Sequence, residues 1–219
     1  MKQLLSYIYP VTKTIESKYS GTLEITWYNG KKHLNSANAN YSYGSLQRIL
    51  KYGIEKIELS KVNSILVLGM GGGSVIKTLR TDFKYTNAIE AVELDPVIID
   101  IAKSEFGIED NQHLKIHCTD AFNFIEANTK LFDLIIIDLY IDLSVPDKFL
   151  STTFWDHVLN SKSSKGYLLF NASVKETDID NVETLVSYLK TKVYKVAVYK
   201  KVNKTNTLII TSFLYNIIN

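Results

Sequence analysis

The sequence is poor in cysteine and proline and contains no long hydrophobic run. Its one cysteine, Cys118, cannot form an intrachain disulfide, and its position in the apparent strand LKIHCTDA predicts a thiol packed in the core. With only 3 prolines and 46% hydrophobic residues, the chain is expected to be globular rather than disordered. No run of about 18 apolar residues indicates a membrane span, and the N-terminal segment lacks the cleavage site of a signal peptide. These absences predict a cytoplasmic protein that does not bind membranes.

The sequence also lacks an excess of one charge. Its 25 basic and 23 acidic side chains give a formal net charge of +2, so no strong field attracts nucleic acid or anionic lipid. The lysine-rich stretch YKKVNKT is explained by a solvated hairpin turn. The four histidines show no ligand spacing with one another or with Cys118, so we expect no metal site and no nucleic-acid partner.

Apolar, strand-like runs alternate with helical patterns from residue 63 onward. This alternation is typical of a parallel sheet covered by helices on both faces, which makes a doubly wound α/β domain the expected architecture. The expected strands span residues 64–69, 88–95, 114–120, 132–140 and 166–173. The expected helices span residues 73–83, 96–107, 121–129, 152–161 and 179–193.

Two further strands are expected at residues 194–202 and 206–215. The link between them is too short for a crossover helix, so they should form an antiparallel hairpin at the edge of the sheet. A mostly parallel, seven-stranded sheet that ends in such a hairpin is typical of class I S-adenosylmethionine-dependent methyltransferases. A dinucleotide-binding Rossmann domain more often continues with another helix-connected parallel strand.

The N-terminal residues differ in kind from the rest. Asn29 and Gly30 lie between runs of β-forming residues and predict a hairpin over residues 21–37. A two-stranded hairpin is marginal by itself, so it must pack on the main domain or on another subunit. We therefore expect a small N-terminal β-hairpin extension, residues 1–44, and a Rossmann-like methyltransferase-fold domain, residues 45–219, which opens with a helix over residues 45–59.

A cluster of glycines follows the first strand of this domain, although the whole chain has only 10. Glycines in a strand-to-helix turn let the backbone bend and approach a ligand closely, and the next helix offers unpaired N–H groups. The spacing lacks the last glycine of the dinucleotide fingerprint and suits adenosylmethionine better. The alternative is a turn that only eases strand-to-helix packing. The cofactor-binding candidates here are Gly69, Gly71, Gly72 and Gly73.

An acidic residue ends the second strand of the domain. Glu93 stands where a carboxylate can accept hydrogen bonds from both ribose hydroxyls of a nucleoside, and Leu94 beside it is assigned to the same site. A surface glutamate or a helix cap is the alternative for Glu93. Asp95 is better interpreted as the cap, because Pro96 suits the first turn of a helix.

Acidic residues also follow the third and fourth strands. Asp120 can accept a hydrogen bond from the adenine amino group, and the neighbouring amide of Ala121 can meet the ring. An N-cap for the next helix explains Asp120 equally well, and one residue can do both. Asp138 follows the fourth strand, beside the switch point where such sheets bind ligands. Together these positions predict a nucleoside site along one edge of the sheet.

With these residues, the chain resembles the spermidine synthase family and, more broadly, class I methyltransferases. The likeness runs from about residue 20 to about residue 170, and is carried by NYSYGSLQRIL, VLGMGGGSVIKTL, VELDPVIIDIAK, CTDAFNFI and FDLIIIDLY, followed by FW. The resemblance implies that the cofactor is S-adenosylmethionine or decarboxylated S-adenosylmethionine. It implies that the cofactor site and its floor are built from Gly69, Gly71, Gly73, Glu93, Asp120 and Asp138.

The sequence departs from this family at informative places. Gly72 replaces the loop aspartate that helps to hold the amino group of decarboxylated adenosylmethionine, and the Tyr-His-Glu segment keeps only Tyr43. An ungapped match places Ile141 where the amine-deprotonating carboxylate belongs, and Asp142 replaces it only if the loop shifts by one residue. The chain is also short for a spermidine synthase. We expect the fold and the nucleoside site to be retained, whereas these departures argue against polyamine biosynthesis without removing it as an alternative.

The leading functional hypothesis is a transferase that moves an alkyl group, most simply methyl, from the cofactor to a small-molecule acceptor. Such a displacement depends chiefly on alignment, which tolerates the missing carboxylates. Asp138, Tyr140 and Asp142 are the catalytic candidates, and Tyr43 and Tyr140 are the substrate-binding candidates; a solvated loop is the alternative for Tyr140 and Asp142. Two other functions remain: a polyamine aminopropyltransferase with Asp142 as base and Asp138 as amine ligand, and a non-catalytic family member. The resemblance also implies a homodimer.

Overall fold

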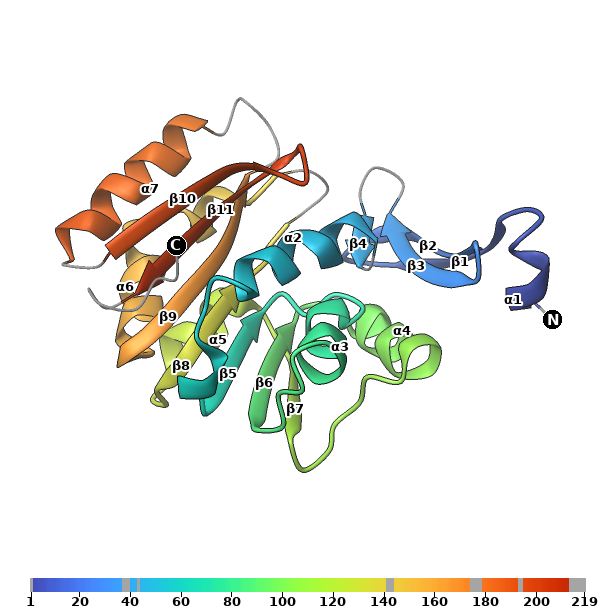
Figure 1. Ribbon diagram of the computed structural model, residues 1–219, viewed down its shortest axis with the longest axis horizontal. Helices are drawn as coiled ribbons and strands as arrows, with labels where there is room; N and C mark the ends of the chain where they lie inside the picture. Colours follow the sequence, from blue (N-terminus) through green and yellow to red (C-terminus); the bar gives the residue numbers. More distant parts are fainter. Residues whose placement is uncertain are drawn as a thin grey trace.

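The computed structural model describes residues 2–36, 40–42, 44–140, 144–173, 179–192 and 195–212. In this part of the chain the main body is a seven-stranded sheet with the order β10-β11-β9-β8-β5-β6-β7 (Figure 1). The five strands from β9 to β7 are parallel, and β11 and β10 continue the sheet as antiparallel neighbours. The strands are β5 (Ser64–Leu68), β6 (Ala88–Glu93), β7 (Leu114–Cys118), β8 (Phe132–Ile137), β9 (Lys162–Ser173), β10 (Lys195–Val202) and β11 (Asn206–Ser212). The predicted fold class is confirmed.

Helices cover both faces of this sheet, as the alternating pattern predicts. One apolar core joins the sheet to α2 (Ser45–Ile54), α3 (Ser74–Thr81) and α4 (Pro96–Phe106). A second core joins the opposite face to α5 (Ala121–Ala127), α6 (Thr152–Asn160) and α7 (Ile179–Thr191). The main body also contains two short 3₁₀ helices, η1 (Leu59–Lys61) and η2 (Asp147–Phe149). None of the helices described is long and apolar enough to cross a membrane.

The central strands are apolar on both faces because both faces are covered. In β8, Leu134 and Ile136 enter the first core, while Ile135 and Ile137 enter the second, and all four are fully buried. A strand with alternate sides buried against helices has no solvent-facing position, which explains the continuous run LIII in the sequence.

The N-terminal residues form a second sheet rather than a single hairpin. The predicted hairpin is present, with Asn29 and Gly30 at φ 47° and 73° as a tight turn of this kind requires. Two more strands flank it, giving the order β1-β2-β3-β4. The elements of this part are α1 (Lys2–Leu5), β1 (Val11–Ser17), β2 (Gly21–Tyr28), β3 (Lys31–Ser36) and β4 (Asn40–Ser42). The additional strand β1 escaped prediction because it is an edge strand without a fully buried residue, so its sequence lacks a strong apolar alternation.

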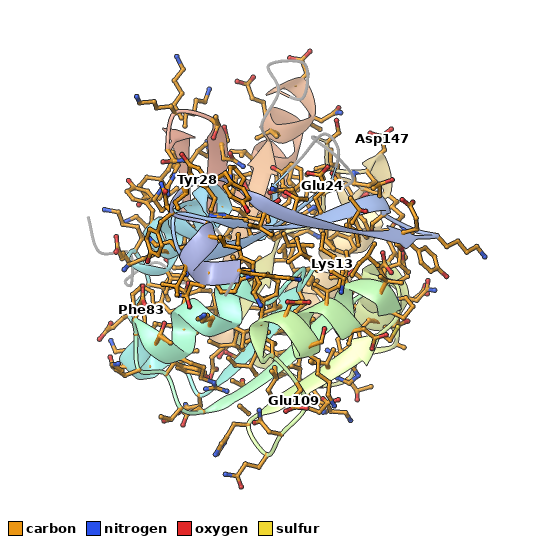
Figure 2. All side chains as sticks on the ribbon, turned by 90° about the vertical axis from the view of Figure 1, so that its right-hand side faces the viewer. Lys13, Glu24, Tyr28, Phe83, Glu109 and Asp147 are labelled. Atoms are coloured by element: carbon orange, nitrogen blue, oxygen red, sulfur yellow. The ribbon has the colours of Figure 1, made fainter. Side chains whose placement is uncertain are left out.

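One face of the N-terminal sheet packs on α4. Leu23, Ile25 and Leu34 of the sheet form an apolar cluster with Ile98 and Ile101 of the helix. Figure 2 shows Lys13 on the side of the sheet toward α4 and Glu24 on the opposite side. The N-terminal sheet is therefore attached to the main body through the helix that follows β6.

Several predicted element ends were too long, and Cys118 was misplaced. β7 ends at Cys118 and β8 at Ile137, so Asp120 and Asp138 lie just beyond the ends of these strands. The first helix of the main body ends at Ile54 and not near residue 59. Cys118 is exposed and not packed in the core, because β7 is an edge strand of the sheet and only Leu114 of its five residues is buried.

Candidate functional site

The glycine-rich turn joins the central strand β5 to α3. The amides of Gly69 and Met70 both donate to the carbonyl of Val92, each over 3.0 Å, which anchors the turn to the end of β6. Gly69 has a φ of 87°, and a Cβ placed on it would lie 2.1 Å from the carbonyl oxygen of Asp138. Gly71 and Gly73 also have positive φ values, 54° and 80°. The turn therefore requires glycine both for its conformation and for its close approach to the end of β8.

Glu93 is the last residue of β6 and is held from both sides by main-chain amides. Its Oε2 accepts from the amide of Gly71 over 2.8 Å, and its Oε1 accepts from the amide of Asp95 over 3.1 Å. Burial raises the pKa of this carboxyl, and the hydrogen bonds from these amides oppose that effect. The amide of Leu94 also donates to this carboxyl, and a carboxylate has about four acceptor positions, so acceptor capacity remains for a ligand hydroxyl.

Leu94 and Asp95 follow Glu93 and have different surroundings. Leu94 is 39% exposed and presents apolar surface at the carboxyl edge of the sheet. Asp95 is the N-cap of α4, accepting from the amide of Val97 over 2.9 Å, as the sequence predicted. The predicted capping role of Asp95 is therefore confirmed, and the ligand role of Glu93 stays a prediction.

Asp120 caps α5 and also forms an ion pair. Its Oδ1 accepts from the amides of Phe122 and Asn123, over 2.9 and 3.3 Å, while its Oδ2 accepts from Nζ of Lys148 over 2.6 Å. Burial works to raise the pKa of Asp120, but Lys148 and the two amides outweigh it and hold the pKa below its usual value. Ala121 is the buried first residue of α5. Lys148 comes from η2 and was not predicted.

Asp138 lies directly after β8, where its amide donates to the carbonyl of Leu68 over 2.9 Å. Its Oδ1 accepts from Nδ2 of Asn171 over 2.9 Å, and burial raises the pKa of the carboxyl to about 6. Asn171 is completely buried, and its Oδ1 accepts from Asn206 over 2.8 Å and from the Tyr140 hydroxyl over 3.4 Å. Asn171 therefore forms hydrogen bonds with both Asp138 and Tyr140.

Sequence reasoning missed Asn171 and Asn206. The signal for Asn171 was available, because a polar residue ends the apolar run GYLLFNAS at the same edge of the sheet as the acidic residues. Asn206 opens β11 and reaches Asn171 only because β11 pairs with β9, which the sequence does not reveal. Tyr43 and Asp142, two further candidates, lie outside the described residues.

The raised pKa of Asp138 predicts that replacing this carboxyl with an amide increases the stability of the protein at high pH. A carboxyl whose pKa is raised on folding contributes stability below about pH 4, and that contribution is lost as the pH rises through about 6. Asp138→Asn is expected to raise the free energy of unfolding by about 1 to 2 kcal/mol at pH 8, and to change it little at pH 4. Thermal denaturation at both pH values, with the exposed Asp147→Asn as matched control, measures this effect. An equal change at both pH values would contradict it.

The candidate residues converge on one edge of the sheet. Gly69 follows β5, Glu93 ends β6, Asp120 follows β7 and Asp138 follows β8, and these four strands are neighbours. The chain leaves β5 toward β6 and β7 and later returns to its other side with β8, so β5 and β8 mark the topological switch point. The arrangement can hold a nucleoside across the carboxyl ends of these strands.

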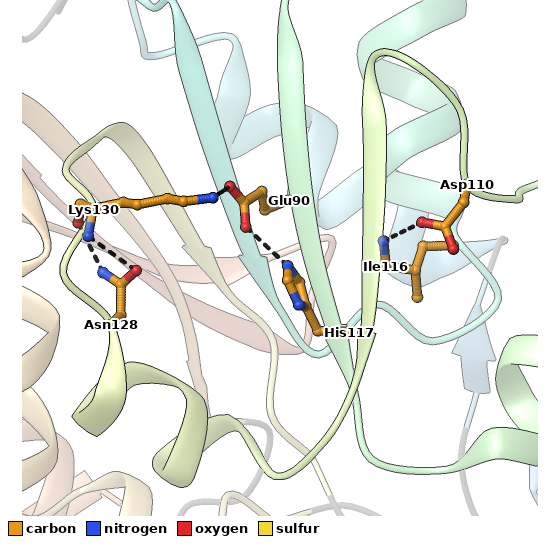
Figure 3. A network of polar contacts seen from close by, with 6 residues as sticks. All are labelled: Glu90, Asp110, Ile116, His117, Asn128 and Lys130. Carbon is orange, nitrogen blue, oxygen red and sulfur yellow. Dashed lines mark hydrogen bonds and ion pairs between the residues drawn. The ribbon is translucent and has the colours of Figure 1, made fainter.

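A polar network away from the carboxyl edge links β6, β7 and the loop before β8. Glu90 of β6 accepts from His117 of β7 over 2.8 Å and from Lys130, in the loop before β8, over 2.5 Å (Figure 3). Burial works to raise the pKa of Glu90, but these two partners lower it overall. This network links β6, which ends at Glu93, to β7, which Asp120 follows. No group of three or more His, Cys, Asp or Glu side chains in the described ranges is arranged to hold a metal ion.

Known proteins resemble this chain in both sequence and fold. An eEF1A lysine and N-terminal methyltransferase from Danio rerio is 28% identical over 137 residues, which are 56% of this chain and 20% of that protein. A polyamine aminopropyltransferase from Vibrio vulnificus is 28% identical over 114 residues, 51% of this chain and 38% of that protein. The chain thus spans one fifth of the first relative and less than half of the second.

A solved structure shares the fold. The structure of human methyltransferase-like protein 13 in complex with SAH superimposes with a TM-score of 0.68, covering 81% of this chain and 86% of that chain at 20% identity. Residues 48–215 match the model of the spermine/spermidine synthase domain, which takes in all four strand ends of the candidate site. The predicted resemblance is therefore confirmed, and the chain belongs to the spermine/spermidine synthase domain family.

Proposed function

We propose that the chain is an S-adenosylmethionine-binding transferase, and that its simplest reaction is methyl transfer to a small-molecule acceptor. The observation that carries the proposal is the carboxylate of Glu93, which two amides hold at the end of β6 beside the glycine turn. Family membership and the names of the relatives, a methyltransferase and an aminopropyltransferase, support the same class of reaction.

The residues present fit such a cofactor. Gly69 packs directly against the backbone of Asp138, where a side chain would clash, and this contact holds the glycine turn beside the end of β8. Glu93 keeps acceptor positions for ribose hydroxyls, and Oδ2 of Asp120 keeps one beside Lys148. The exposed Leu94 offers apolar surface for a base.

The chain contributes alignment and proton acceptance. When bound, S-adenosylmethionine supplies an electrophilic methyl group on a sulfonium sulfur. Asp138, fixed by Asn171, is ionised above about pH 6 and can then accept a proton from a neighbouring nucleophile. Tyr140 presents a hydroxyl held by the same asparagine. These roles make the reaction faster as the pH rises through about 6.

Aminopropyl transfer to a polyamine is the second candidate, and the similarity to the polyamine aminopropyltransferase favours it. It would use decarboxylated S-adenosylmethionine. Against it stand Gly72 in place of the loop aspartate and Ile141 in place of the base. Within the residues that the structure describes, Asp138 is the candidate carboxylate for binding or deprotonating an amine acceptor.

Binding and turnover of the wild-type chain test the proposal. Calorimetry with S-adenosylmethionine, decarboxylated S-adenosylmethionine and methylthioadenosine compares the three ligands side by side. We expect the carboxylated cofactor to bind more tightly than the decarboxylated one, and no product to form from putrescine. Binding of the decarboxylated form alone would favour aminopropyl transfer. If none of the three binds, the transferase proposal is wrong.

We further propose a homodimer in the cytoplasm, in which residues 1–44 serve as an extension of the main domain. Large apolar side chains of the N-terminal region are exposed and can support self-association: Leu4, Tyr7, Ile8, Tyr9, Tyr19 and Tyr28. A chain with one cysteine fits a reducing compartment.

A further inference from the structure

The turn between β1 and β2 makes a specific polar contact with the main body. The hydroxyls of Ser17 and Ser20 both donate to Oδ2 of Asp95, over 2.5 and 2.6 Å. The turn is shaped for this contact, because Oγ of Ser17 also accepts from the amides of Tyr19 and Ser20, over 3.1 and 3.4 Å. Two side chains from a distant part of the sequence thus meet on a single carboxylate oxygen.

Asp95 connects this turn to the candidate nucleoside site. Asp95 as a whole is 1% exposed, and its other carboxylate oxygen, Oδ1, caps α4 at the amide of Val97. Its own amide donates to Oε1 of Glu93. A buried carboxylate is stable only when hydrogen-bonded, so the serines help to determine where Asp95 and its amide lie. A continuous path of hydrogen bonds therefore runs from Ser17 and Ser20, through Asp95, to Glu93.

We propose that Ser17 and Ser20 are positioning residues for nucleoside binding, acting through Asp95 to fix the orientation of the Glu93 carboxylate. This inference rests on the proposed function, because it takes Glu93 as the acceptor for the ribose hydroxyls. It gives the N-terminal sheet a part in ligand binding although neither serine contacts the ligand.

The contact is separable from the attachment of the N-terminal sheet. Leu23, Ile25 and Leu34 pack on Ile98 and Ile101 independently of the serines, and burial of large apolar side chains contributes most to such packing. Removal of the two hydroxyls should therefore leave the sheet docked on α4. What changes is the support of Asp95 and, through its amide, the support of Glu93.

The test compares serine variants with a matched threonine variant of the same sheet. Ser17→Ala/Ser20→Ala removes both donors, and Ser20→Ala alone serves if the double variant does not fold. Thr22→Ala is the control, because the Thr22 hydroxyl bonds Glu16 on the exposed surface of the sheet. Calorimetry measures the affinity for methylthioadenosine and for its 2′,3′-dideoxy analogue, and thermal denaturation checks that each variant is folded.

We expect the double variant to bind methylthioadenosine about tenfold more weakly than the wild type, the scale of about one lost hydrogen bond to a charged group. Its affinity for the dideoxy analogue should match that of the wild type. Thr22→Ala should change neither, and Ser20→Thr should keep the wild-type affinity.

Two results would overturn the inference while leaving the proposed function intact. One is an unchanged affinity of the serine variants for methylthioadenosine. The other is an equal loss for both ligands, which would indicate a general disturbance and not a ribose-specific one. If the wild type binds neither methylthioadenosine nor either form of S-adenosylmethionine, the proposed function itself is wrong, so the two failures are distinguishable.

Discussion

Glu93→Ala is expected to lower the affinity for S-adenosylhomocysteine by about a hundredfold, the largest effect of any single side chain at the site. The reason is the loss of two charge-assisted hydrogen bonds to the ribose, each worth about 1.5 kcal/mol or more. The alanine also leaves the amides of Gly71 and Asp95 without their present acceptor. Calorimetric titration of the wild type and the variant measures the ratio of the two dissociation constants.

The matched control for this variant lies three positions earlier on the same strand. Glu90→Gln alters a half-buried glutamate with polar partners of its own, His117 and Lys130, away from the carboxyl edge of the sheet. We expect it to lower the free energy of unfolding and to leave the affinity for S-adenosylhomocysteine within about twofold of the wild type. If Glu93→Ala binds as well as Glu90→Gln, the carboxylate of Glu93 does not hold the ribose.

Cys118 offers an independent report on where the ligand lies. It is the one cysteine of the chain, it is exposed, and its Sγ lies 4.0 Å from the carbonyl oxygen of Leu94. A nucleoside bound between Glu93 and Asp120 would cover the end of β7. Saturating S-adenosylhomocysteine should therefore slow the reaction of Cys118 with a thiol reagent in the wild type, and the protection should be lost in Glu93→Ala.

Gly69→Ala is expected to be the most destabilising substitution of the glycine turn, costing about 3 to 5 kcal/mol, and to abolish nucleoside binding. A Cβ at residue 69 would lie 2.1 Å from the carbonyl oxygen of Asp138, and the residue keeps a φ of 87° that disfavours alanine. Relief of this contact must move backbone, either the turn or the segment after β8. Chemical denaturation and calorimetry measure the loss of stability and of affinity.

Gly107→Ala separates the effect of the steric contact from the effect of the positive φ. Gly107 has a φ of 70° at the end of α4, but nothing lies within 4 Å of the Cβ that would be added. Its substitution should therefore cost only the conformational strain, about 1 kcal/mol. A Gly69→Ala variant no less stable than Gly107→Ala would show that the approach of the turn to Asp138 is not as close as described.

Local sequence patterns sufficed to predict much of the fold and the positions of the main candidate site residues. Apolar runs such as LIII in β8 locate the buried strands, and residues that directly follow parallel strands must share an edge. These two rules place Gly69, Glu93, Asp120 and Asp138 at the same edge of the sheet from the sequence alone. The capping role of Asp95 followed from the proline after it.

Long-range contacts account for what was missed. Lys148 reaches Asp120, Asn206 reaches Asn171, and Ser17 reaches Asp95, and each pair depends on how distant segments fold back. No periodicity encodes such a meeting. The prediction that Cys118 is packed in the core was wrong for a related reason, since the sequence does not reveal that β7 is an edge strand.

The strand order has a consequence for the assembly of the protein during synthesis. β11 is the last strand described, yet it lies between β9 and β10 and is not at the rim of the sheet. β10 is synthesised first, but it can join the sheet only after β11 has been synthesised and has paired with β9. In contrast, β5, β6, β7 and β8 can pair earlier. The cradle for the ligand can form while the chain is still emerging, but Asp138 gains the full support of Asn171 and Asn206 only after β11 inserts.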